Sequence, residues 1–168
     1  MRRTTSIVLS AGAGAVCALA CLFCWLYASS PPSLPDLTME HFESNWNRWA
    51  EHGPANYDIE VEVRGPQAAT YHVEVRDGEA ISATRDDYPL KGPRTIGTWS
   101  VVGMFHTMEI DLDQLVLDAA ETSKSARLLL DCRFDPEWGF PTRYRRIEVG
   151  SQMHVEWQVI SFTTRNAS

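Results

Sequence analysis

Cysteine is almost absent from most of this chain. The sequence has 168 residues and four cysteines, and three of the four fall within residues 7–28. Only Cys132 lies beyond that stretch, so no disulfide can form within the remaining chain, and packing must supply its stability. Cys132 alternates with leucines, which predicts a buried and unreactive thiol.

The chain also lacks the short motifs that mark common active sites. No serine stands in a nucleophile elbow, and no histidine has a recurrent metal-ligand spacing. Glu109, Asp111 and Asp113 resemble a calcium loop only superficially, because no glycine supplies the turn. His72 and His154 could meet only if their strands are neighbours. We therefore predict no catalytic residue, no cofactor and no metal site.

Negative charge is missing from the start of the chain. No acidic residue precedes Asp36, whereas residues 29–168 hold all 22 acidic residues and 13 of the 15 basic ones, a net charge of −9. Nucleic acid and anionic membrane surfaces are poor partners for such a domain, so we predict no nucleic-acid partner.

Residues 7–28 contain no charged side chain. A helix of this length spans roughly 33 Å, about the thickness of a bilayer's hydrocarbon core. Arg2 and Arg3 precede it, which favours an amino terminus on the cytoplasmic side. We predict that residues 1–28 form a single-pass anchor, with Ile7 to Ala28 in the lipid bilayer and the rest periplasmic or extracellular.

Two alternatives to an anchor remain open. A cleaved signal peptide has a shorter apolar core, of roughly 7–15 residues, and Ala28 and Ser30 make poor cleavage sites. A lipoprotein signal is suggested by Ala18 to Cys21, although the usual leucine is missing. In either case the domain is secreted or lipid-anchored.

A short spacer separates this stretch from the domain. Residues 29–35 contain three prolines, which favour extended polyproline II. We place the domain at residues 36–168, a usual size for one domain.

Two stretches have helical periodicity. Thr38 is a good N-cap, and Gly53 ends the first helix. The second begins after Ser100 and ends near Ala120. The apolar stripe of the first helix comprises Met39, Phe42, Trp46 and Trp49. We expect this stripe to pack on a sheet, with Trp46 mostly buried.

Alternating apolar and polar residues predict six strands. They are residues 57–64, 71–76, 79–84, 127–134, 142–149 and 153–163. Residues 86–97 have two prolines and two glycines and are interpreted as a loop. The predicted fold class is α+β: an N-terminal transmembrane helix, then helix, three strands, helix, three strands, with the helices on one face of an antiparallel sheet.

The Asp77-Gly78 dipeptide predicts a hairpin turn. A two-residue turn would leave Ile81 on the polar face, whereas a three-residue loop would pair Ile81 with Val73. Burying an isoleucine is worth roughly 1.5–3 kcal/mol, so we predict the three-residue loop, with Gly78 at positive φ.

Four segments together resemble a family of uncharacterised bacterial domains, domain of unknown function 6174 (DUF6174). They are residues 49–58, 73–84, 100–105 and 134–142. The resemblance covers about residues 42–162, and the chain departs from it in carrying Arg145 to Glu148 where an aspartate is expected. It implies an export signal or lipoprotein anchor and a similar fold, but no site, because the family has no established activity.

One basic cluster stands out, at Arg143, Tyr144, Arg145 and Arg146. It could hold an acidic partner segment, or its arginines could pair with glutamates on neighbouring strands. The leading functional hypothesis is a membrane-anchored, extracytoplasmic binding or assembly module that is not an enzyme and whose partner is a protein or ligand outside the membrane. The alternatives are a released inhibitor or small-ligand-binding domain and, third, an enzyme of unknown class.

Overall fold

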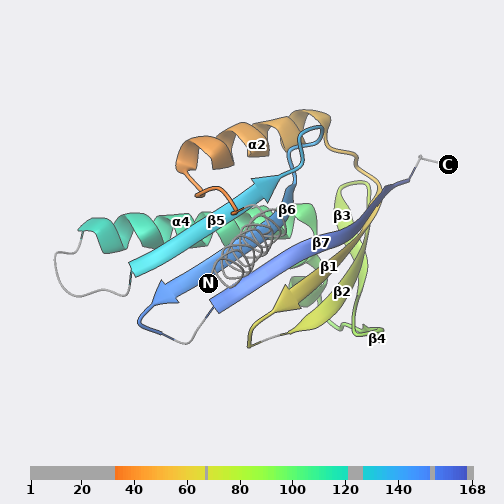
Figure 1. The fold of residues 1–168 in the computed structure, drawn as a ribbon. Coiled ribbons are helices and arrows are strands. Elements are labelled where there is room, and N and C mark those ends of the chain that lie inside the picture. The colour runs from red at the N-terminus through yellow and green to blue at the C-terminus, as the bar shows by residue number, and fades with distance from the viewer. Residues whose placement is uncertain (1–32, 67, 121–126, 152–153, 166–168) are drawn as a thin grey trace, which may run out of the picture. The chain divides into compact units, whose positions relative to one another are not determined.

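Seven strands of the described chain form one antiparallel sheet (Figure 1). The computed structural model describes residues 33–66, 68–120, 127–151 and 154–165. Neighbouring strands follow the order β4-β3-β2-β1-β7-β6-β5. The strands are β1 (Tyr57–Arg64), β2 (Ala69–Arg76), β3 (Glu79–Arg85), β4 (Tyr88–Pro89), β5 (Arg127–Phe134), β6 (Pro141–Val149) and β7 (His154–Thr164). The helices are α2 (Met39–His52), α3 (Pro93–Gly97) and α4 (Val101–Ala120).

The predicted fold class needs correction. Among the described residues, no helix is both long and apolar enough to cross a membrane. The stretch 7–28, for which a transmembrane helix was predicted, lies outside the described residues. The described order is one helix, four strands, two helices and three strands. This is an α+β arrangement of an antiparallel sheet with a few helices.

The loop predicted for residues 86–97 contains two of these elements. The short strand β4 pairs with the end of β3, and Leu90 N–H donates to the Ala83 carbonyl at 2.8 Å. Helix α3 begins at Pro93. A proline in the first turn needs no backbone N–H partner and has a φ suited to a helix. The prolines that indicated a loop are therefore compatible with both elements.

The predicted helix ends are confirmed. Thr38 Oγ1 accepts the N–H of His41 at 3.2 Å, and α2 stops at Gly53. Ser100 Oγ accepts the N–H of Gly103 at 3.2 Å at the start of α4. Each side chain satisfies a backbone donor that the first helical turn leaves without an intrahelical partner.

Helices α2 and α4 pack on the same face of the sheet (Figure 1). From α4, Phe105 stacks on Phe134 of β5, with ring centroids 6.1 Å apart. From α2, Trp49 meets Tyr57 of β1 edge-on at 5.5 Å. Tyr57 also holds the start of α4, because its hydroxyl accepts the N–H of Val101 at 3.1 Å. Burial raises the pKa of Tyr57 to about 12, against a lowering effect of that hydrogen bond.

The β2–β3 hairpin differs from the prediction. Arg76 pairs directly with Glu79 across a two-residue turn, and Ile81 is 56% exposed. Both turn residues have positive φ, 53° at Asp77 and 81° at Gly78. Such turns match the right-handed twist of the flanking strands. The positive φ of Gly78 was predicted correctly, but the loop length was wrong.

A bulge explains why the shorter turn is tolerated. Val75 pairs with Ala80, whereas Glu74 pairs with Ser82, so Ile81 is an extra residue in β3. The bulge returns Ala83 to the buried face opposite Val73. The prediction considered loop length alone and therefore assigned Ile81 to the core.

Both sheet edges are partly blocked. At β5, Asp36 forms an antiparallel bridge with Asp131, and Cys132 N–H donates to the Pro35 carbonyl at 3.0 Å. At the other edge, β4 has two residues, one of them Pro89, which cannot donate a ladder hydrogen bond. Neither edge offers a long free strand at these positions.

Candidate functional site

A groove of about 290 Å³ lies between α2 and α4. Three aromatic side chains form its apolar part, Phe42 and Trp46 from α2 and Phe105 from α4. Val102, His106 and Glu109 complete the lining from α4. The groove therefore has an aromatic floor and a polar margin.

Edge-on ring contacts fix the shape of the floor. The Phe105 ring centroid lies 5.6 Å from that of Phe42 and 5.1 Å from that of Trp46. Phe42 and Phe105 are buried, but Trp46 is only partly buried. Trp46 is partly buried against the core as expected, but its ring contact is with Phe105 of α4, and it also faces the groove. Its remaining accessible surface is available to a partner.

Single exposed apolar side chains lie beyond the groove on both helices. Met39 is 41% exposed and lies seven residues before Trp46, two turns away on the same flank of α2. On α4, Val102 and Val116 are 47% and 60% exposed and lie fourteen residues apart, about four turns. Exposed His106, Glu109 and Asp113 lie between the two valines on the same flank, so apolar and polar side chains alternate along it.

The margins of this surface are acidic. Glu43 lies on α2 between Met39 and Trp46, and Glu109 and Asp113 lie on the groove flank of α4. All three are exposed. The twenty residues of α4 include no Lys or Arg. The single arginine of α2, Arg48, points elsewhere and donates to the Pro136 carbonyl at 2.9 Å.

A close backbone contact sets the start of α4. A Cβ built on Gly103 would lie 2.1 Å from the Gly97 carbonyl oxygen and 2.6 Å from that of Thr98. Glycine is therefore required where α3 meets α4. This contact positions the first turn of α4, which carries Val102 and Phe105.

The groove also contains one histidine–carboxylate pair. His106 Nδ1 lies 3.5 Å from Glu109 Oε2, and both side chains are exposed. The other four lining side chains are hydrocarbon or indole, so the lining supplies no nucleophile beside this pair. The pair contributes polarity to the margin.

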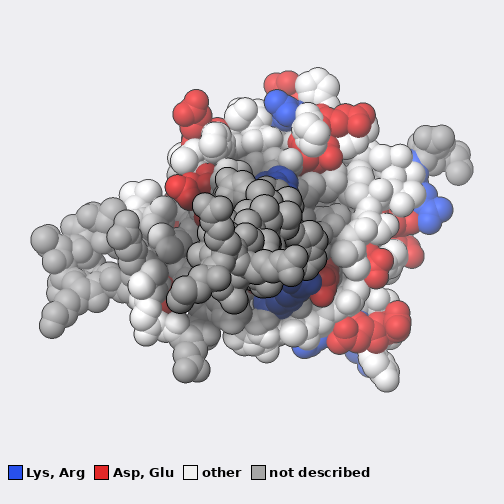
Figure 2. Space-filling view, in the orientation of Figure 1, with Lys and Arg blue, Asp and Glu red and all other residues white. Residues whose placement is uncertain are grey.

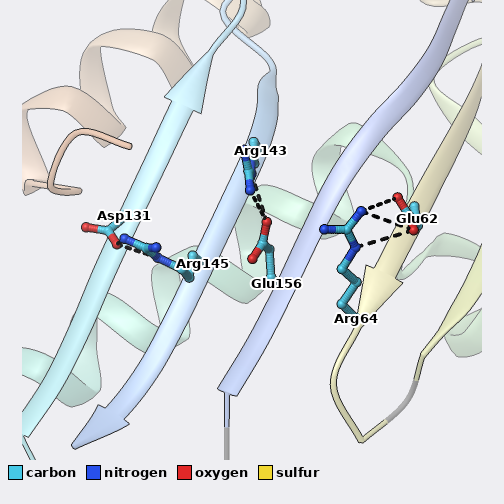
Figure 3. Close-up of polar contacts among 6 residues, drawn as sticks. All are labelled: Glu62, Arg64, Asp131, Arg143, Arg145 and Glu156. Carbon is cyan, nitrogen blue, oxygen red and sulfur yellow. Dashed lines mark hydrogen bonds and ion pairs between the residues drawn. The ribbon is translucent and has the colours of Figure 1, made fainter. Parts of the chain in front are cut away.

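The predicted basic cluster is split between the two faces of the sheet. On the face without helices, Arg143 Nε donates to Glu156 Oε1 and Arg145 Nε to Asp131 Oδ2, each at 2.8 Å (Figure 3). These pairs join neighbouring strands. On the coloured part of this face in Figure 2, basic (blue) and acidic (red) side chains lie next to one another.

The other two members of the cluster lie under α4. Tyr144 is buried, and its hydroxyl donates to Asp111 Oδ2 at 2.6 Å, while Arg146 Nε donates to Asp111 Oδ1 at 3.1 Å. Burial and the Asp111 charge raise the pKa of the Tyr144 hydroxyl far above its usual value. This triad fastens α4 to β6, so the four residues do not form one surface.

The two histidines considered for a metal site do not meet. His72 pairs with Glu60 of β1, and His154 pairs with Ile147 of β6. Strand β1 lies between β2 and β7, which separates them. Within the described residues, no three His, Cys, Asp or Glu side chains are grouped to hold a metal ion. Cys132 is buried as predicted, and burial raises its thiol pKa well above the usual value.

A second hollow, of about 320 Å³, lies on the face of the sheet without helices. His72, Glu60 and Asp86 are among its lining residues. Asp86 Oδ1 accepts the Thr70 N–H at 2.9 Å, and the Asp86 N–H donates to the Thr70 carbonyl at 2.8 Å. These bonds give Asp86 a structural role in the connection after β3.

The sequence contained one signal for the groove. The Met39–Trp49 stripe predicts packing on the sheet, which holds for Trp49 against Tyr57 of β1, whereas Trp46 contacts Phe105 of α4. No pattern in either helix identifies which neighbour covers it. Comparisons with protein-family models and with curated proteins give no match. The resemblance to the DUF6174 family therefore stays a prediction.

Proposed function

We propose that this domain is a non-enzymatic binding or assembly module, and that it takes up a polypeptide segment in the groove between α2 and α4. The observation that carries the proposal is the partly exposed Trp46 beside Val102 and above the buried Phe105. An aromatic anchor with remaining accessible surface is typical of protein-binding hot spots.

The shape of the surface favours a polypeptide over a small molecule. Small-molecule pockets enclose most of their ligand in roughly 300–1,000 Å³. This groove is just below that range, and a further exposed apolar side chain, Val116, lies on the same flank of α4. A groove between two helices, with exposed apolar side chains on both, suits a helix laid along it.

Strand addition at the sheet edge is less well supported. The bridge at Asp36 occupies part of the β5 edge, and Pro89 interrupts the opposite edge. The basic cluster is a weaker candidate than the groove, since Arg143 and Arg145 already have carboxylate partners. Binding an acidic segment there would require these ion pairs to be exchanged.

The proposal places the module outside the cytoplasm. Its support is the uncharged sequence of residues 7–28 after Arg2 and Arg3, which is typical of export. Amino-terminal sequencing and lipid analysis of the mature protein distinguish retention, cleavage and lipidation of this segment. A cytoplasmic protein with an intact, unmodified amino terminus would contradict the location.

Photo-crosslinking tests the binding site directly. The probe is an uncharged amphipathic peptide of Leu and Gln with a benzophenone on its leucine face. Irradiated with the full-length chain, it should give adducts that peptide mapping places at Trp46, Val102 or their lining neighbours. Val102→Gln should reduce these adducts severalfold, because it removes an apolar contact from the rim.

The matched control is Val149→Gln. Val149 is 48% exposed, nearly the same as Val102, but it ends β6. This variant should leave the groove adducts unchanged. Adducts spread evenly over the chain, or equally reduced by both variants, would contradict a docking role for the groove.

A further inference from the structure

We infer that the segment received by the groove is a cationic amphipathic helix of a partner protein, with lysines or arginines flanking an apolar stripe. This inference rests on the proposed function and adds the charge of the partner. The supporting observation is the distribution of exposed carboxylates around the groove.

Three exposed carboxylates lie at or near the groove. Glu109 lines it, whereas Glu43 of α2 and Asp113 of α4 lie within one helical turn of lining residues, Glu43 before Trp46 and Asp113 after Glu109. His106 Nδ1 lies 3.5 Å from Glu109 Oε2. Among the described residues, no Lys or Arg forms an ion pair with any of the three carboxylates.

On the face of the sheet without helices, three carboxylates have arginine partners. There Glu156 is paired with Arg143, and Asp131 with Arg145 (Figure 3). Glu62 is likewise paired with Arg64. Several acids of this face therefore have arginine partners, whereas none of the three carboxylates at or near the groove has one among the described residues. A partner that supplies cations complements this groove and avoids like-charge repulsion.

The geometry also sets the length of the partner. On α4 the exposed Val102 and Val116 lie about 21 Å apart at ~1.5 Å per residue, with Glu109 and Asp113 between them. A partner helix of about four turns matches this distance. Its apolar residues would contact Trp46 and Val102, and its cations would reach Glu43 on one side and Glu109 on the other.

A set of three peptides tests the charge. All carry the same leucine stripe and benzophenone, and their polar positions are Lys, Gln or Glu. With the full-length chain at low salt, the Lys peptide should bind about tenfold more tightly than the Gln peptide, and the Glu peptide should bind most weakly. The preference should shrink at about 1 M salt, where the screening length is only about 3 Å.

Charge reversal locates the effect. Glu43→Lys with Glu109→Lys should abolish the Lys preference or invert it. The matched control, Glu79→Lys with Glu137→Lys, changes the net charge equally at two exposed positions outside the two helices that form the groove. If the control variant loses the preference equally, the attraction comes from overall charge and the inference fails.

The outcomes separate the two proposals. Groove adducts from the Gln peptide without any gain for the Lys peptide overturn the cationic partner and leave the binding function standing. Absence of groove adducts from all three peptides overturns the binding function itself. Groove adducts that are strongest for the Lys peptide and sensitive only to the groove reversal support both.

Discussion

The two faces of the sheet differ in how their charged side chains are paired. On the face without helices, arginines and carboxylates pair across neighbouring strands, as Arg143 does with Glu156. On the helical side, the outer flank of α4 carries carboxylates and no Lys or Arg at all. Several charges of the first surface are paired within the chain, and we propose that a partner supplies the complement of the second.

Between the sheet and α4, a buried carboxylate joins two elements. Asp111 receives Tyr144 and Arg146 and fastens α4 to β6. Removing one partner of such a group leaves a desolvated charge, whereas an exposed pair returns to water at little cost. The same residue types thus serve attachment, solubility or recognition according to their exposure. Four predictions follow from this contrast.

The largest effect is expected from the aromatic stripe of α2. Trp49→Ala should lower the free energy of unfolding by about 3–5 kcal/mol, because Trp49 is buried against Tyr57 and Phe140. Trp46→Ala should cost roughly half as much and also weaken peptide binding in the groove. Denaturant unfolding of both variants measures the difference, and equal losses would contradict the assignment of Trp46 to the groove.

The next effect compares a buried polar contact with a more exposed one. Tyr144→Phe should destabilise the protein by about 1–3 kcal/mol, since Asp111 loses a short, buried hydrogen bond. Arg143→Gln, which opens an ion pair on the other face, should cost about 1 kcal/mol or less. A larger loss for Arg143→Gln would reverse the proposed ranking of the two faces.

A pH-dependent effect is expected at Asp58. Burial alone would raise its pKa, but Arg76 and Arg165 outweigh burial and hold the pKa below the ordinary 3.8. Arg165 Nε donates to Asp58 Oδ2 at 2.7 Å, and Arg76 Nη1 lies 2.8 Å from Oδ1. Arg76 also donates to two backbone carbonyls, so we interpret its contact with Asp58 as an ion pair.

Because the folded pKa is depressed, this contribution is present above pH 3.8 and is lost as the pH falls through the folded pKa. Asp58→Asn should therefore cost about 1–2 kcal/mol at neutral pH, and the gap from wild type should narrow in acid. Unfolding curves measured across this pH range give the result. The exposed Asp113→Asn serves as control, and a constant gap would count against the ion pairs.

The smallest effect is expected at Ile81. Its side chain is exposed in the bulge, so Ile81→Thr should change stability by less than about 0.5 kcal/mol. Ala83→Thr, on the buried face, should cost about 1–3 kcal/mol. A loss of 1.5–3 kcal/mol at Ile81 would instead support the three-residue loop.

Local patterns predicted most of the secondary structure. Thr38 and Ser100 mark helix starts because a side-chain oxygen beside the first turn satisfies nearby N–H groups. Alternation predicted β1 without error, since its side chains must face two different environments. The short elements β4 and α3 were missed, because a two-residue strand and a five-residue helix have no detectable period.

The candidate site was predicted less well. The basic cluster was found as a run of neighbours in sequence, but strand alternation sends Arg143 and Tyr144 to opposite faces. The groove has no such run, because Trp46 and Val102 come from helices separated by four strands. The predicted register at Ile81 was wrong for a related reason. A bulge in β3, and not a longer turn, brings Ala83 opposite Val73.

The sequence by itself determined where the two long helices begin, which residues of β1 and β2 face inward, and that Cys132 is buried. These features depend on neighbours within a few positions along the chain. Only the tertiary structure decided that α2 meets α4, that Arg146 and Tyr144 share Asp111, and that Trp46 and Val102 line one groove. Those contacts join residues far apart in sequence, and they depend on strand order and helix placement, which no local period encodes.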